Sequence, residues 1–97
     1  MKKGYWIIRS DITDEEKFNN YVAKTPAALA KFDAKFLVRA GGEFSVVEGS
    51  SRSRNLIIEF PSYQVALDCW ASEEYQSARQ ERLGGAELDI VVVEAVG

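Results

Sequence analysis

Two kinds of hydrophobic periodicity alternate along the chain, and their order constrains the fold more than any other feature of the sequence. The two-residue period of a half-buried β-strand occurs in residues 5–12, 35–40, 54–60 and 88–96. The helical period occurs in residues 13–32 and 61–83. The sequence therefore predicts the order strand, helix, strand, strand, helix, strand.

The first predicted helix has a start signal and an internal break signal. Thr13 is followed three residues later by Glu16, so the two residues can form a capping box in which each side chain bonds the other's backbone amide. Pro26 lacks the N–H that would bond the carbonyl of Val22. We therefore expect a kink at Pro26, or a restart of the helix with Thr25 as its cap.

The second helical stretch contains two start signals. Pro61-Ser62 predicts the first start, and the serine of Ser72-Glu73-Glu74 predicts a second cap followed by acidic residues that suit a helix N-terminus. Tyr75, Ala78, Arg79 and Leu83 would line the inward side of the continuation. Gly84-Gly85 is expected to end it.

The segment between the second and third strands is rich in turn residues. Gly41-Gly42 predicts a bulge or bend, after which strand character resumes in Phe44–Glu48. The polar residues 49–53 predict a hairpin loop that leads into the third strand. The second and third strands are therefore expected to be neighbours in the sheet.

This order of elements is the split βαβ pattern of ferredoxin-like domains, so we expect an α+β fold with a four-stranded antiparallel sheet. At 97 residues the chain lies at the low end of the usual domain range, so we expect one domain over residues 1–97. Both helices would cover one face of the sheet and leave the other face open.

The alternation within each strand assigns its residues to the covered face or the open face. The expected covered set is Trp6, Ile8, Phe36, Val38, Leu56, Ile58, Phe60, Ile90 and Val92. The expected open set is apolar at Tyr5, Ile7, Leu37, Ile57, Val91 and Val93, and polar at Arg9, Arg39, Asn55, Glu59 and Asp89.

A monomer would expose the apolar part of the open face to water. Burying six such side chains would yield on the order of 9 to 18 kcal/mol, at roughly 1.5 to 3 kcal/mol each. Association costs an estimated ~4 to 15 kcal/mol, so the balance favours a second copy of the chain on this face. We therefore expect a homodimer.

Composition excludes several classes of function. The chain has no histidine, which argues against a haem ligated by histidine, the ordinary zinc and iron sites and a serine–histidine nucleophile, so neither a metal nor a cofactor is expected. Cys69 is the only cysteine, which rules out an intramolecular disulfide and fits a reducing, cytoplasmic location.

A net charge of -3 argues against nucleic acid as a partner. The apolar run 5–8 is too short for a signal peptide or a membrane span, so no membrane association is expected.

Several short motifs resemble one known family over nearly the whole chain and in the right order. They are Tyr21 with Pro26, Leu37-Val38-Arg39 followed by glycines, residues 47–49, residues 58–62, Cys69-Trp70, residues 72–76, and Asp89 leading to Val93-Glu94. With these motifs the chain resembles the family called domain of unknown function 1330, in the dimeric α+β barrel superfamily. Two stretches depart from the family pattern. Phe32-Asp33-Ala34 stands where relatives often carry a histidine or tyrosine with a glycine pair, and residues 39–42 carry an extra residue.

The resemblance implies a ferredoxin-like fold in which the sheets of two subunits meet face to face as a barrel. It implies no established activity. Neighbouring families on this fold include cofactor-free quinone-forming monooxygenases, haem-degrading enzymes, lactone isomerases and stress-response barrels. Fold alone does not choose among them.

Three charged residues of the open face are candidates for a site, because a charge enclosed by apolar walls usually pairs with another charge or with a ligand. They are Arg9, Arg39 and Glu59. Arg39 can clamp a carboxylate or an enolate, or it can pair with Glu59. Glu59 can act as a general base, or it can be the counter-ion of Arg39.

Two aromatic residues flank the break in the second helical stretch. Trp70 and Tyr75 can wall a pocket for an aromatic ligand, or they can belong to the core, where aromatic residues at helical spacing are common.

Three functions fit these observations. The first is a dimeric binding module for a small anionic or aromatic metabolite, with a pocket at the open face lined by Arg39, Glu59, Trp70 and Tyr75. The second is a cofactor-free enzyme of the monooxygenase or isomerase kind in which Glu59 or a tyrosine removes a proton. The third is a structural or stress-associated dimer that binds no ligand.

Overall fold

The computed structural model describes all 97 residues and contains the expected order of strands and helices. The elements are β1 (Gly4–Ile12), α1 (Glu15–Lys31), β2 (Lys35–Val38), β3 (Arg54–Phe60), α2 (Tyr63–Ala71), α3 (Glu73–Arg82) and β4 (Ala86–Glu94). The second helical stretch forms two helices because Ser72, the predicted second cap, accepts a hydrogen bond from the backbone N–H of Tyr75 at the start of α3.

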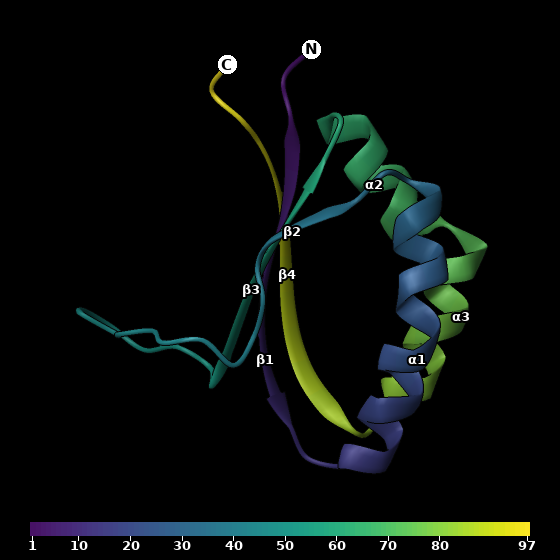
Figure 1. Cartoon of the computed structure of the whole chain (residues 1–97). Helices are drawn as coiled ribbons and strands as arrows, with labels where there is room; N and C mark the ends of the chain where they lie inside the picture. The colour runs from purple at the N-terminus through teal and green to yellow at the C-terminus, as the bar shows by residue number, and fades with distance from the viewer.

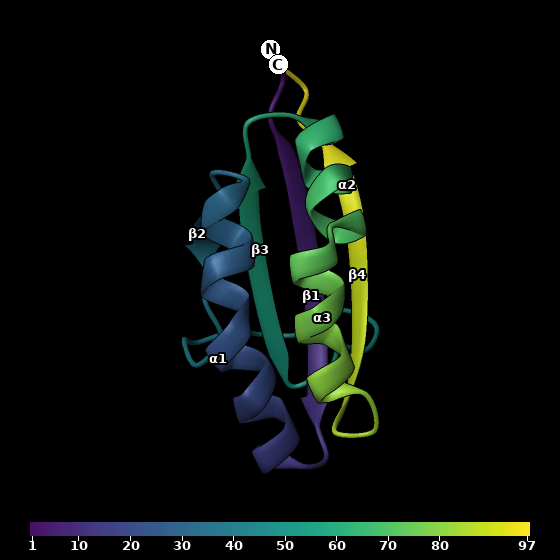
Figure 2. The same cartoon turned by 90° about the vertical axis from the view of Figure 1, so that its right-hand side faces the viewer.

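The four strands form one antiparallel sheet in the order β2-β3-β1-β4. All three helices lie on one face of this sheet (Figure 1). In the perpendicular view α1 lies over β2 and β3, whereas α2 and α3 lie over β1 and β4 (Figure 2). This is the expected ferredoxin-like α+β fold, with one sheet face covered and the other open. No helix combines the length and the apolar character that crossing a membrane requires.

The core lies between the sheet and the helices, and the Trp6 side chain of β1 is at its centre. Its indole Nε1–H donates to the backbone carbonyl of Ala66 in α2 at 2.9 Å. Its ring centroid lies 5.0 Å from those of Phe60 and Tyr75. The indole therefore joins the sheet to α2 and α3 through both a hydrogen bond and aromatic packing.

The capping box expected at the start of α1 was wrong, and of the two alternatives at Pro26 the restart is excluded. Asp14 and not Thr13 is the N-cap, because the backbone N–H groups of both residues donate to the carbonyl of Gly85 and the Asp14 side chain accepts from Lys17. The helix also continues through Pro26 without a restart. The Thr25 hydroxyl donates to the Val22 carbonyl at 3.3 Å, which supplies the hydrogen bond that the proline cannot make.

The second strand is shorter than predicted and contains a bulge. Phe36 pairs with Ile58 but Val38 pairs with Ile57, so Leu37 is the extra residue between them. Val38 consequently belongs to the open face and is 42% exposed, whereas the alternation had assigned it to the covered face.

Residues 39–53, here called the arm, contain no strand, so the predicted strand Phe44–Glu48 was also wrong. The arm leaves the sheet after the bulge and projects on the side opposite the helices (Figure 1). An alternating sequence forms a strand only beside a partner strand, and the arm has none.

Candidate functional site

A cavity of about 210 Å³ lies beneath α1, between this helix and the covered face of the sheet. Twelve of its 16 lining residues are hydrophobic, and they come from α1, α3, β1, β2, β3 and β4 as well as the start of the arm. The other four are Ser10, Thr25, Arg39 and Arg54, so no carboxylate lines the cavity. The pocket was expected on the open face, but this cavity lies on the opposite side of the sheet.

Arg39 and Arg54 both line the cavity. The part of the wall formed by Arg54 and Ser10 is called the arginine end below. Arg54 of β3 pairs in register with Ser10 of β1, which puts both side chains on the covered face. The Arg54 guanidinium lies 5.0 Å from the centroid of Phe18, and that of Arg39 lies 4.0 Å from the centroid of Phe36.

The arginine end contains unpaired polar groups. Arg52 is the only arginine in the chain with a carboxylate partner, so neither Arg39 nor Arg54 is neutralised by an ion pair. Ser10 is 1% exposed, and neither its hydroxyl oxygen nor the buried Nε of Arg54 has a hydrogen-bond partner. Buried polar groups are normally satisfied, so this end of the cavity is suited to a ligand that brings acceptor oxygens.

Two tyrosines form a second polar part of the wall, called the tyrosine wall below. The hydroxyl oxygens of Tyr21 and Tyr75 are 2.9 Å apart, and Arg82 Nη2 donates to the Tyr75 hydroxyl at 3.4 Å. The Arg82 guanidinium also lies 5.1 Å from the centroid of the Tyr21 ring. Burial raises the pKa of Tyr21 well above its ordinary value, and the neighbouring Tyr75 raises it further. This phenol therefore keeps its proton at neutral pH.

Arg82 was missed because Leu83 was expected to face inward. The structure buries Arg82 to 5% exposure and leaves Leu83 42% exposed. The signal was present in the sequence, since Tyr75, Ala78 and Arg82 are spaced by three and four residues along one face of α3.

The structure separates the five predicted site residues. Arg39 and Tyr75 line the cavity on the covered face. Trp70 packs on Tyr75 at 5.4 Å between ring centroids but does not line the cavity. Arg9 is exposed on the open face, and Glu59 also lies there.

The ion pair between Arg39 and Glu59, one of the two alternatives for these residues, is not formed, because β2 ends before Arg39 and the arginine lines the cavity. Glu59 instead binds Lys3 at 3.2 Å. The strand pleat puts Glu59 on the face opposite the cavity, so it cannot act as a base there.

Sequence reasoning also overlooked Arg54. It has the same strand parity as Leu56, Ile58 and Phe60, three residues assigned to the covered face. Parity alone could therefore have placed this charge beneath the helices.

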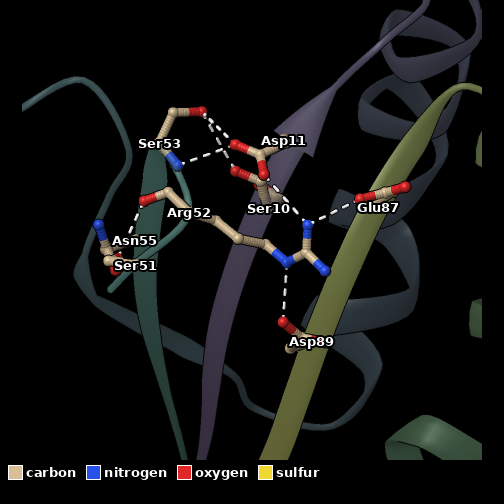
Figure 3. Close-up of polar contacts among 8 residues, drawn as sticks. All are labelled: Ser10, Asp11, Ser51, Arg52, Ser53, Asn55, Glu87 and Asp89. Carbon is tan, nitrogen blue, oxygen red and sulfur yellow. Dashed lines mark hydrogen bonds and ion pairs between the residues drawn. The ribbon is translucent and has the colours of Figure 1, made fainter. Parts of the chain in front are cut away.

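A different arginine holds the base of the arm against the sheet (Figure 3). Arg52 binds Asp89 through Nε at 2.8 Å and Glu87 and Asp11 through Nη1 at 2.9 and 3.1 Å. The backbone N–H and hydroxyl of Ser53 both donate to Asp11 Oδ1. No group of three or more acidic, cysteine or histidine residues is arranged to hold a metal ion.

These contacts predict the acid titration of Asp11. The pKa of its carboxyl is lowered, first by the Ser53 backbone N–H, then by the Ser53 hydroxyl and by Arg52. A carboxyl with a lower pKa in the folded state stabilises that state above its unfolded pKa of about 3.9, and this contribution is lost as the pH falls through the folded value. An NMR titration of the Asp11 carboxyl should give a midpoint below ~3.9.

The Ser53→Ala and Arg52→Gln substitutions should each raise that midpoint, because each removes a hydrogen bond to the ionised form. Ser51→Ala is the control, since Ser51 bonds only Arg52 and Asn55. An unchanged midpoint in both test variants would contradict the role given to these contacts.

The fold and the cavity define a small ferredoxin-like α+β protein with an apolar, positively charged space under its helices. The chain belongs to the family described as Domain of unknown function (DUF1330), whose model matches residues 3–96. The family expected from the sequence motifs is thereby confirmed. Comparison with curated proteins found no similar sequence.

Solved structures with the same fold share little sequence with this chain. A protein of unknown function from Rhodopseudomonas palustris has a TM-score of 0.76 and 11% identity, covering 99% of this chain and 84% of that chain. A dimeric protein of unknown function with a ferredoxin-like fold from Bacteroides fragilis has a TM-score of 0.61 and 19% identity, with 96% of each chain covered. SnoaB, a cofactor-independent oxygenase from Streptomyces nogalater, has a TM-score of 0.62 and 9% identity, covering 100% of this chain and 96% of that chain. At these identities the likeness concerns the fold alone.

Proposed function

We propose that this protein is a homodimeric, single-domain binding protein that holds a small organic anion with an apolar or aromatic body in the cavity beneath α1. The observation that carries this proposal is the lining of the cavity. It contains twelve hydrophobic residues and two arginines, with no carboxylate to neutralise them. A ligand carboxylate would supply the missing partner.

The arginine end favours an anion for a physical reason. The Arg54 guanidinium, whose Nε is buried without a partner, has lost part of its hydration, and an acceptor of opposite charge would recover the free energy of that loss. Arg39 is exposed, so its charge is available to a ligand without that loss. Hydrogen bonds between guanidinium groups and carboxylates are among the strongest in proteins. Ser10 adds a neutral hydroxyl beside Arg54.

The size of the cavity limits the ligand. A volume of about 210 Å³ corresponds to roughly seven waters at ~30 Å³ each. It is below the ~300 to 1,000 Å³ typical of pockets for drug-sized molecules. An aromatic acid with a single ring is the size class we propose.

The dimer part of the proposal rests on the open face. Ile7 of β1 lies between Ile57 of β3 and Val91 of β4, so three branched apolar residues form a row across the uncovered sheet. The arm projects on this same side (Figure 1). The structurally similar protein from Bacteroides fragilis is a dimer, which supports the same assembly in this chain.

An enzymatic function ranks second. The fold is shared with an oxygenase that needs no cofactor, which supports only the possibility of such chemistry on this scaffold. The cavity lining offers no carboxylate, and the raised pKa of Tyr21 keeps its phenol protonated. Neither a carboxylate nor a Tyr21 phenolate is therefore present in the cavity to take a proton from a substrate at neutral pH, whereas several side chains are suited to bind one.

The test compares a charged ligand with a neutral one by calorimetry. Wild-type protein should bind 4-ethylbenzoate at least about tenfold more tightly than 4-ethylbenzamide, because only the carboxylate carries a charge opposite to that of the arginines. Arg39→Met and Arg54→Met, which keep the apolar stem but remove the charge, should each weaken binding of the acid about tenfold. Arg79→Met should change it little, since Arg79 lies over Trp70 and does not line the cavity.

Three results would contradict the proposal. Equal affinity for acid and amide would show that the arginine end does not recognise charge. Weaker binding in Arg9→Met, with Arg39→Met unaffected, would move the site to the open face, where Arg9 lies. Failure of both ligands to bind would favour a structural or stress-associated dimer without a ligand.

A further inference from the structure

We propose that the tyrosine wall is a hydrogen-bond donor site, and that it selects organic acids carrying a second acceptor oxygen, such as a ketone or quinone carbonyl. This inference rests on the proposed function, because it concerns the same cavity. It adds a chemical class to the ligand: an aromatic acid that also bears a carbonyl group.

A count of hydrogens at the tyrosine wall carries the inference. Arginine has only donors, and each tyrosine hydroxyl has one proton to donate. The structure contains two hydrogen bonds among these groups, one from Arg82 to the Tyr75 oxygen and one between Tyr75 and Tyr21. Whichever tyrosine donates to the other, one hydroxyl proton is left without an acceptor.

The charge of Arg82 decides which proton is left. An oxygen that accepts from a cation becomes a better donor itself, so Tyr75 donates to Tyr21. Tyr21 then keeps its own proton, and neither hydroxyl has any other hydrogen-bond partner in the structure. Both tyrosines are buried and line the cavity, so the cavity is the space from which an acceptor can come.

The hydroxyl donor that lacks an acceptor is distinct from the arginine end. Tyr75 packs edge-on against Trp6 at 5.0 Å between ring centroids, while Ser10 lies four residues further along β1 beside Arg54. The raised pKa of Tyr21 means that the donor persists through the neutral range. A ligand that satisfies both parts of the cavity therefore has an acid at one position and a carbonyl at another.

The experiment uses two acids that differ in one group. Wild-type protein should bind 4-acetylbenzoate about fivefold to tenfold more tightly than 4-ethylbenzoate, because only the acetyl group accepts a hydrogen bond. The 3-acetyl and 3-ethyl acids form a second pair that allows for a different spacing, and at least one pair should show the preference. Tyr21→Phe leaves the Tyr75 proton without an acceptor, so this variant should keep part of the preference, whereas the Tyr21→Phe/Tyr75→Phe double variant should abolish it.

Two controls separate this inference from the proposed function. Tyr63→Phe, on the surface of α2, should keep the full preference. Arg39→Met should weaken both members of a pair by the same factor, since it acts on their common carboxylate. Equal affinity within both pairs, or a preference that survives in the double variant, overturns the donor site while leaving acid binding intact. Failure of all four acids to bind overturns the proposed function and the donor site together.

Discussion

Replacing Ile7 with aspartate is expected to convert the proposed dimer to a monomer. Ile7 is at the centre of the open face, paired in register with Ile57 on one side and Val91 on the other. In a two-fold symmetric dimer the substitution puts two unpaired carboxylates into an apolar interface. Each buried charge without a partner costs several kcal/mol, so the dissociation constant should rise by roughly 100-fold or more.

Analytical ultracentrifugation over a range of concentrations measures this change. Leu83→Asp adds the same charge at the exposed end of α3, on the helix side, and should leave the assembly unchanged. Far-ultraviolet circular dichroism would establish that both variants are folded. A dimer of unchanged affinity in Ile7→Asp would show that the open face is not the interface.

The second large effect is expected from Gly4→Ala. A Cβ atom at Gly4 would lie 2.5 Å from the backbone carbonyl oxygen of Ser62 and 2.6 Å from the Cα of Tyr63. Both are backbone atoms at the start of α2, so the helix would have to move away from β1. Such overpacking costs about 3 kcal/mol, which lowers the Tm of a domain this size by roughly 10 to 20 °C.

Gly42→Ala is the matched control for this stability measurement. Gly42 has an ordinary backbone conformation, and nothing lies within 4 Å of the position that its Cβ would take. Its Tm should change by at most ~4 °C in either direction. Differential scanning calorimetry measures the Tm of both variants. A similar Tm for Gly4→Ala and wild type would contradict the close approach of α2 to β1.

The sequence predicted the sheet well because strand periodicity is a local property. Alternation assigned Trp6, Ile8 and Ile58 to the covered face, and all three are buried there. It failed at Val38, because a single bulged residue reverses the parity of whatever follows it. It failed in the arm as well, since strand formation there depends on a neighbouring strand that no local pattern reports.

The helix signals succeeded where only local hydrogen bonds were involved. Ser62 and Ser72 cap α2 and α3 as predicted, each by accepting from the amide three residues on. Thr13 failed as a cap because the carbonyl of Gly85, a residue distant in sequence, accepts from the Thr13 backbone N–H that the capping box would have used.

The cavity was harder to predict than the fold. The predicted site consisted largely of charged residues on the open face, because a charged residue among apolar ones stands out in an alternating strand. Arg54 follows the same alternation on the covered face, and Arg82 follows the helical spacing of Tyr75 and Ala78. Their contribution to one cavity depends on how α1 and α3 sit on the sheet, which is set by tertiary packing.

The binding site is tested most directly by a crystal structure of the protein with 4-acetylbenzoate. Electron density for the ligand is expected between α1 and the sheet, with its carboxylate within hydrogen-bond distance of Arg39 or Arg54. Density at the open face beside Arg9, or a cavity that stays free of ligand at saturating concentration, would contradict the assignment of the cavity beneath α1 as the binding site.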